Sequence, residues 1–262
     1  MQAPTVSQLL ACDVQHDGHL RRYLFDDDSV RYVKIMSSPH NHHFHDQPLP
    51  CIPAGTWNSA TIDIDRKTDQ LVFQTAVTRT LGSVTVTEFN LTWCPPSIDH
   101  LDLQLCQGRS RNGRFATYRD SPFDLFGCPI VVKIARFDHE IPDIQQECDM
   151  YRLIHGKGIG SKFLGYVTEA GRIIGFVLKK NKEAQRPRPR DFKKYKLVLR
   201  KLHRLGYLHQ DCHHGNVLYV VNKDHAIMVD FKSVTKISED NGVKQGKKSD
   251  FETLRTACGI SD

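Results

Sequence analysis

The chain has 262 residues, enough for one large domain or two small ones, and its 39% hydrophobic and 25% charged content is ordinary for a globular protein. The net charge of +6 suits anionic ligands but does not by itself require nucleic acid. The sequence has no apolar run of transmembrane length and no basic-then-apolar amino terminus, so we expect a soluble, intracellular protein of the cytoplasm that does not bind a membrane.

The eight cysteines form no C-x-x-C pair and show neither a zinc-ligand spacing nor the framework of a secreted protein. Cys106, Cys128 and Cys148 lie inside apolar stretches, where a reduced thiol behaves as a small hydrophobic side chain. We therefore expect free thiols rather than disulfides.

We expect residues 1–95 to form a β-rich amino-terminal extension. The first 56 residues are irregular except for one hairpin, in which segments 20–25 and 30–36 pair across an acidic turn. The pair Pro95-Pro96 marks the end of the extension. Further strands are predicted where β-branched and alternating residues gather, over 61–65, 71–77 and 83–93.

From His100 onward the pattern predicts three strands, a helix, two strands and a second helix. In the second helix, Asp191 is expected to cap the first turn and Gly206 to end the helix. The basic, Pro-containing stretch before it, 179–190, is predicted to be a linker. The expected strands cover 101–106, 115–118, 129–135, 163–167 and 173–178, and the expected helices cover 142–155 and 191–205.

Three oxygen-bearing side chains stand out in the carboxy-terminal half. Asp211 and Asn216 lie five residues apart, and Asp230 follows a second apolar run, a layout that predicts a hairpin whose two ends meet at one metal. A carboxylate can orient a hydroxyl proton, while an amide oxygen and a second carboxylate can hold Mg²⁺ against the phosphates of ATP. The three residues are therefore candidates for a phosphoryl-transfer site.

A lysine inside an apolar strand is the second signal. Lys133 is flanked by Val131, Val132, Ile134 and Ala135, and burying an unpaired ammonium group is costly. Glu147 lies on the helix that follows, on the same face as its apolar residues. The simplest interpretation is that the two side chains pair, and the alternative is a surface ion pair on an edge strand.

The order of a strand with Lys, a helix with Glu, two strands, a helix, H-x-D-x-x-x-x-N and then D-F resembles the protein-kinase-like superfamily over residues 100–258. The resemblance implies an α+β, two-lobed fold. Its β-rich nucleotide lobe would cover about 96–180 and a truncated helical lobe about 181–262, with the β-rich extension before them. ATP would lie between the lobes.

The resemblance also assigns roles to particular residues. Lys133, held by Glu147, would orient the α- and β-phosphates of ATP, and Asp211 would be the catalytic aspartate. Asn216 and Asp230 would hold Mg²⁺.

Two further residues would support this loop. His209 matches the loop histidine that braces the metal-binding turn in the family. Asp250 matches an aspartate that ties down the catalytic loop, although Ser249 and Glu252 around it also form a simple capping box. The sequence leaves these two interpretations of Asp250 open.

The segment 177–180 matches the hinge whose backbone hydrogen-bonds adenine in the family. Leu178 would cover the adenine ring and Lys179 would belong to the same contact, while Phe176 would lie at the back of the pocket.

Departures from the family pattern leave the activity and the acceptor open. No G-x-G-x-x-G precedes Lys133, and an arginine-rich turn over 107–114 takes its place. Lys232 follows Phe231 where the family has glycine, so a flipping switch there is not expected. The loop form with His213 is typical of small-molecule kinases of the aminoglycoside-kinase type, and only 12 residues follow Asp250 (262 − 250), which predicts the truncated helical lobe.

The resemblance therefore implies an ATP-dependent phosphotransferase that moves the γ-phosphoryl group of Mg-ATP to a hydroxyl acceptor, either protein Ser/Thr or a small molecule. One alternative is a pseudokinase that binds ATP or a partner without catalysis. Another is a basic nucleic-acid-binding protein, because the run 179–204 is basic, although its exposed helix face is the simpler interpretation and nucleic acid is the less expected partner. The four histidines within 40–45 are expected to form a polar loop rather than a zinc or nickel site.

Overall fold

The computed structural model describes residues 4–36, 49–65, 67–68, 70–86, 94–105, 113–118, 130–181, 183–237 and 242–260. Within these ranges the protein is mixed α+β, rich in sheet, with three α-helices. It divides into two compact units. Unit 1 comprises Met1–Ser83 and Arg136–His139, and unit 2 comprises Val84–Ala135 and Glu140–Asp262. The sequence placed a boundary after residue 95, whereas this division falls after Ser83.

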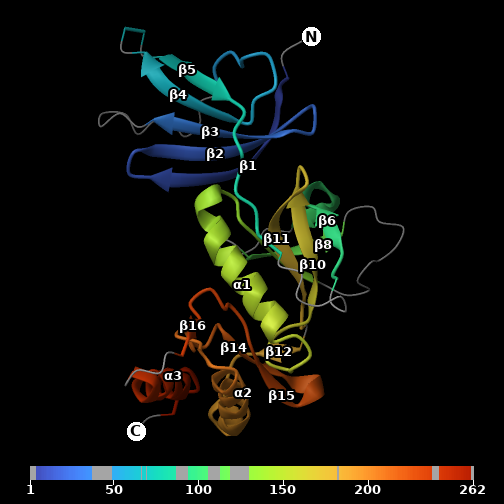
Figure 1. The fold of residues 1–262 in the computed structure, drawn as a ribbon, viewed down its shortest axis with the longest axis vertical. Helices are drawn as coiled ribbons and strands as arrows, with labels where there is room; N and C mark the ends of the chain where they lie inside the picture. Colours follow the sequence, from blue (N-terminus) through green and yellow to red (C-terminus); the bar gives the residue numbers. More distant parts are fainter. Residues whose placement is uncertain are drawn as a thin grey trace. The chain divides into compact units, whose positions relative to one another are not determined.

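Unit 1 is built on a five-stranded sheet whose strands follow chain order (Figure 1). All neighbours are antiparallel except β3 and β4, which are parallel. The predicted hairpin is confirmed as β2 and β3. The strands are β1 (Val6–Gln15), β2 (Gly18–Phe25), β3 (Val30–Met36), β4 (Ser59–Asp65) and β5 (Gln70–Val77).

Strand β1 lies in a region expected to be irregular, so that expectation is wrong there. The strand forms an edge of the sheet, and Ala11 is its one fully buried residue. Its register with β2 shifts twice, between Val6 and Gln8 and between Leu9 and Ala11. These irregularities remove the alternating pattern that identifies a strand in a sequence. The strand expected over 83–93 is not present in its described part, residues 83–86, and the remainder lies outside the described residues.

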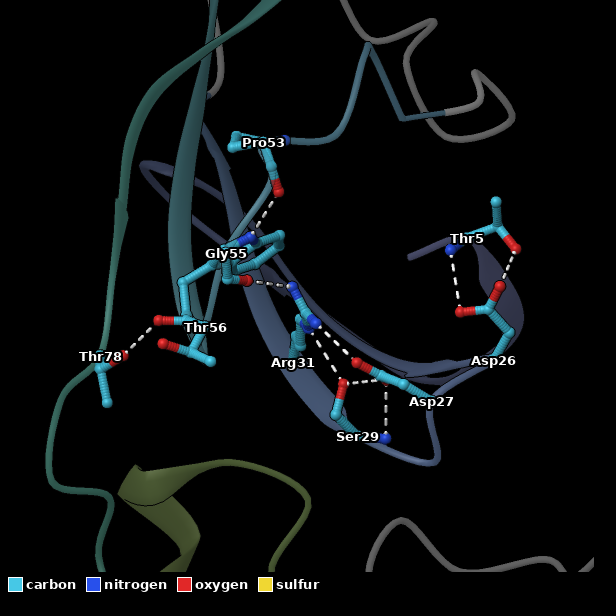
Figure 2. Close-up of polar contacts among 10 residues, drawn as sticks. Thr5, Asp26, Asp27, Ser29, Arg31, Pro53, Gly55, Thr56 and Thr78 are labelled. Atoms are coloured by element: carbon cyan, nitrogen blue, oxygen red, sulfur yellow. Dashed lines mark hydrogen bonds and ion pairs between the residues drawn. The ribbon is translucent and has the colours of Figure 1, made fainter. Parts of the chain in front are cut away.

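A buried arginine of unit 1 contacts two aromatic rings and donates hydrogen bonds to Asp27 and Ser29, and Figure 2 shows these bonds. Arg31 is 3% exposed, and its guanidinium lies over the rings of Phe25 and Trp57, 4.6 and 4.7 Å from their centroids. It donates to Asp27 Oδ2 at 2.9 Å and to Ser29 Oγ at 3.0 Å. Because a buried cation needs compensation, these partners make the position specific for a planar, multidentate side chain.

Other polar contacts tie the loops of unit 1 to its strands (Figure 2). The N–H and hydroxyl groups of Thr5 donate to the two carboxylate oxygens of Asp26 at 3.0 and 2.6 Å. Thr78 Oγ1 donates to the carbonyl of Thr56 at 2.7 Å. These bonds satisfy backbone and side-chain groups that would otherwise lack partners beside the sheet.

Unit 2 contains a six-stranded sheet of order β6-β10-β11-β9-β8-β7. Its neighbours are antiparallel except for β6 and β10, and helix α1 (Ile141–Leu153) packs against β11. Gly175 is needed where β11 passes β9, because a Cβ there would lie 2.2 Å from the carbonyl oxygen of Lys133. The strands are β6 (Ser97–Asp99), β7 (Leu103–Leu105), β8 (Gly113–Tyr118), β9 (Ile130–Ile134), β10 (Phe163–Glu169) and β11 (Arg172–Lys179).

The rest of unit 2 holds two helices and two small sheets, β12-β14-β15 and β13-β16. Strand β12 lies within the segment predicted to be a linker. The elements are β12 (Ala184–Gln185), α2 (Phe192–Arg204), β13 (Tyr207–Leu208), β14 (Val217–Val220), β15 (His225–Met228), β16 (Thr235–Lys236) and α3 (Gly242–Ala257), with short 3₁₀ turns at His100–Asp102, Asp138–Glu140, Pro189–Asp191 and Val221–Lys223.

Helix α2 confirms the second predicted helix but corrects its start. Asp191 occupies the N-cap position, yet its side chain makes no capping bond and instead accepts from Arg188 Nε at 3.2 Å. Gly206 ends the helix as expected, with a φ of 85°. Of the predicted apolar stripe, four side chains are buried: Tyr195, Val198, Leu199 and Leu202. The fifth, Leu205, is partly buried and packs against the same core.

Among the described residues, no helix is long and apolar enough to cross a membrane. The six described cysteines are all free, as expected. Burial raises the pKa of the Cys148 and Cys212 thiols, which keeps them protonated and unreactive.

Replacing Arg31 by Ala should lower the free energy of unfolding of unit 1 by about 2–3 kcal/mol, because charge-assisted hydrogen bonds and cation–π contacts are lost together. Arg79→Ala is the matched control, since Arg79 is half exposed and pairs with Asp138 at 3.4 Å. Its expected effect is within about 0.5 kcal/mol. Urea unfolding followed by circular dichroism measures both, and equal losses would contradict the role given to Arg31.

Candidate functional site

The hairpin of β14 and β15 brings two of the predicted site residues together. Val217 pairs with Met228, and the N–H of Val229 donates to the carbonyl of Asn216 at 2.9 Å. Asp230 is the next residue, so Asn216 and Asp230 stand at the same end of the hairpin. The predicted hairpin is therefore present, and a metal at its end stays a prediction.

Lys133 connects this hairpin end to the six-stranded sheet. Its Nζ lies 2.7 Å from both carboxylate oxygens of Glu147 and 3.3 Å from Asp230 Oδ1. The expected pairing of Lys133 with Glu147 is therefore present, and the Lys133 side chain is only 15% exposed, which excludes the alternative of a surface ion pair. The contact with Asp230 was not foreseen from the sequence, because it joins residues 97 positions apart.

Glu147 is presented by the buried face of α1, together with Ile144, Cys148 and Tyr151. Burial raises the pKa of Glu147 although the ammonium of Lys133 acts in the opposite direction. The backbone N–H of Phe231 also donates to Glu147 Oε2 at 3.4 Å. Glu147 thus holds both the ammonium group and the turn after Asp230.

Asp211 and Asn216 touch each other across their loop. Asn216 Nδ2 donates to Asp211 Oδ2 at 2.9 Å and to the Asp211 carbonyl at 3.1 Å. Because the amide hydrogens of Asn216 are used in this way, its side-chain oxygen is the atom left to meet a cation.

His209 lies beneath this loop and is fully buried. Its ring packs on Phe231, with centroids 5.4 Å apart, and its Nε2 lies 3.2 Å from the carbonyl oxygen of Val229. A carbonyl only accepts, so Nε2 carries the hydrogen in this contact. Burial lowers the pKa of His209 below its usual value. Its place beside Val229 suits a positioning residue for the turn at Asp230, rather than a group that touches substrate.

Asp250 anchors the same loop from α3. Its two carboxylate oxygens accept from the backbone N–H groups of His209 and Gln210, both at 2.9 Å, and Oδ2 also contacts His203 Nε2 at 2.9 Å. Burial acts to raise the pKa of Asp250, but these hydrogen bonds outweigh it and hold the pKa below its usual value. The capping-box interpretation is wrong, because α3 begins at Gly242 and Asp250 lies in its interior.

The backbone is strained at two points of this site. Gln210, directly before Asp211, has a φ of 64°, and Asp230 has a φ of 63°. Such left-handed conformations are uncommon for residues other than glycine and persist where neighbouring contacts enforce them. Here Asp250 holds Gln210, while Lys133 contacts Asp230.

His213 adds a contact that the sequence did not reveal. Its Nδ1 accepts from the N–H of Gly215 at 2.9 Å, so the ring hydrogen of the neutral form is on Nε2, which lies 3.7 Å from Asp211 Oδ1. A Cβ at Gly215 would approach this ring to 2.7 Å. In the sequence, the glycine two residues after His213 was the one feature that could have indicated this hydrogen bond.

In segment 177–180, which the sequence predicted to hydrogen-bond adenine, one backbone donor is already bonded within the protein. The N–H of Lys179 donates to the carbonyl of Lys162 at 2.8 Å, so this donor is already used. Leu178 and Phe176 are buried in the hydrophobic core. An adenine contact at this segment would therefore need a donor other than the N–H of Lys179.

The donor atoms suit Mg²⁺, which prefers oxygen ligands and takes one or two carboxylates together with phosphate and water. Asp230 supplies a carboxylate and Asn216 an amide oxygen at one end of a hairpin. Nowhere in the described ranges do three or more His, Cys, Asp or Glu side chains form a group that could hold a metal ion. The histidines at 40–45 and the arginines at 109 and 111 lie outside the described residues.

The chain matches no known protein family, and no curated protein matches its sequence.

Lowering the pH below about 6.5 should destabilise unit 2, because the unfolded state binds a proton at His209 that the folded state excludes. This contribution to stability is complete above pH 6.5, is lost as the pH falls toward the depressed pKa of folded His209, and changes no further below it. Urea unfolding at pH 5, 6, 7 and 8 measures the slope.

His209→Gln keeps a donor near the position of Nε2 but cannot titrate, so its slope over this range should be flatter. His214→Gln, an exposed change in the same loop, is the control and should keep the parent slope. The same slope in all three proteins would show that His209 is not the group responsible.

Proposed function

We propose that unit 2 is an ATP-dependent phosphotransferase of the protein-kinase-like superfamily. The observation that carries the proposal is the position of Lys133, whose ammonium contacts Glu147 from α1 and Asp230 from the end of the β14–β15 hairpin. Three segments distant in sequence meet at one partly exposed cation, beside an amide and a second carboxylate. This combination suits the alignment of a polyphosphate better than structural ion pairing alone.

Lys133 would bind the phosphates of ATP. Its contact with Asp230 is the longer of its two ion pairs, 3.3 Å against 2.7 Å, and the Asp230 side chain is 29% exposed. Exchange of the Asp230 contact for a phosphate oxygen would leave Lys133 still held by Glu147. Glu147 is then a positioning residue that keeps the ammonium in place.

Asn216 and Asp230 would hold Mg²⁺ through their side-chain oxygens. When bound, Mg²⁺ would neutralise charge that develops on the phosphates during transfer. The hydrogen bond from Asn216 Nδ2 to Asp211 fixes the orientation of the amide.

Asp211 would orient the hydroxyl group of the acceptor and take its proton. Its side chain is 34% exposed and lies next to Asn216, so it can reach both solvent and the metal-binding side chains.

Asp211→Asn should reduce phosphoryl transfer at least about 100-fold and leave the stabilisation by Mg-ATP unchanged, because general base catalysis is lost while the phosphate contacts remain. Lys133→Met should reduce both the phosphoryl transfer and the stabilisation by Mg-ATP. Transfer from [γ-³²P]ATP to the protein itself or to water measures activity, and thermal shift with Mg-ATP measures binding.

Lys236→Met, an exposed change elsewhere in unit 2, is the control for Lys133→Met and should behave as the parent. Nucleotide binding without transfer in the parent protein would favour a pseudokinase. No response to Mg-ATP at all would contradict the proposal.

A further inference from the structure

The positive charge of the chain is concentrated in one segment. Residues 186–204 contain nine Lys or Arg and one Asp, a net charge of +8 (9 − 1), whereas the whole chain carries +6. The remaining residues therefore sum to −2 (6 − 8). Such asymmetry points to a surface that meets an anion rather than to general basicity.

The exposed face of α2 carries most of this charge. Helical geometry turns each successive residue by about 100°, which places five cations on the side opposite the buried stripe. Leu197, 54% exposed, lies in the middle of this face, and α2 contains no acidic residue. We call this surface the α2 basic face; its cations are Lys193, Lys196, Arg200, Lys201 and Arg204.

These cations have no acidic partner within the part of the chain that the structure describes. Lys196 Nζ lies 5.8 Å from the ring of Phe251, and Lys201 Nζ reaches the carbonyl of Lys157 at 3.5 Å. Like charges occupy i, i+4 positions at 196 and 200 and at 200 and 204, and such pairs destabilise a helix slightly. The folded unit therefore gains nothing from this arrangement, and an anionic partner would relieve it.

The chemistry of the face restricts the partner. A membrane-surface helix buries an apolar face in lipid, but the apolar face of α2 is already buried in the core as Tyr195, Val198, Leu199 and Leu202. A protein interface needs a desolvated apolar or aromatic centre, and Leu197 is the single apolar side chain on this surface. No aromatic side chain is exposed here on which unpaired bases would stack.

We propose that the α2 basic face binds the phosphate backbone of duplex nucleic acid without reading its sequence. From Lys193 to Arg204 the helix rises about 17 Å, close to the axial length of five nucleotides in one strand of a duplex. Lys and Arg side chains neutralise phosphates, and the face carries no Asn, Gln, Asp or Glu side chain that would read adenine or cytosine edges. This function is independent of the phosphotransferase proposed above.

Fluorescence anisotropy with labelled 24-base-pair DNA and RNA duplexes, in 50 to 200 mM KCl, tests the proposal. Five phosphate contacts predict a slope of log K against log salt of about −4.5 for DNA, which is a loss of about 500-fold over this range. Lys193→Gln/Arg200→Gln/Arg204→Gln should reduce the slope to about −1.8 and keep the parent fold by circular dichroism.

Lys223→Gln/Lys236→Gln/Lys244→Gln removes the same charge from exposed positions on other elements and should keep the parent slope. Equal slopes for the two triple variants, or a parent slope shallower than about −2, would overturn the proposal. Tighter binding to single strands than to duplexes would also overturn it. The same holds for binding to vesicles of 30% phosphatidylserine in phosphatidylcholine without binding to duplexes. Thermal shift with Mg-ATP, measured on the same samples, reports separately on the phosphotransferase proposal.

Discussion

The ammonium group of Lys133 is the point on which the rest of the site depends. It is largely removed from solvent, so it needs compensating charge, and Glu147 supplies this with both carboxylate oxygens at 2.7 Å. Asp230 contacts the same ammonium at 3.3 Å, so α1 and the hairpin end both meet strand β9 at Lys133. The hairpin end at Asp230 thus meets this cation, and the Asp211 loop is joined to the same hairpin end through Asn216.

Two buried groups keep the loop in this arrangement. Asp250 binds the N–H groups of His209 and Gln210, and His209 reaches across to the carbonyl of Val229, directly before Asp230. The loop and the hairpin end are thus linked through hydrogen bonds to the Asp250 carboxylate of α3 and from the buried imidazole of His209. These bonds offset the left-handed backbone at Gln210 and Asp230.

Periodicity and charge were enough to predict α1, α2 and the pairing of Lys133 with Glu147, because a buried lysine in an apolar strand needs a partner and the next helix offers one. They did not predict that Asp191 would pair with Arg188 instead of capping α2, since both bonds fit the same sequence. The Lys133–Asp230 contact and the use of the Lys179 N–H by Lys162 depend on tertiary placement, which local pattern does not encode. An edge strand such as β1, with little burial and a shifting register, leaves no clear pattern.

The central claim is that Asn216 and Asp230 offer oxygen ligands to a divalent cation beside Lys133. Electron paramagnetic resonance of Mn²⁺, titrated with the protein in the presence of ATP, tests it most directly. The account predicts that the parent protein lowers the signal of unbound Mn²⁺–ATP and that Asp230→Asn weakens this binding at least about tenfold. Identical titration curves for the two proteins would contradict it.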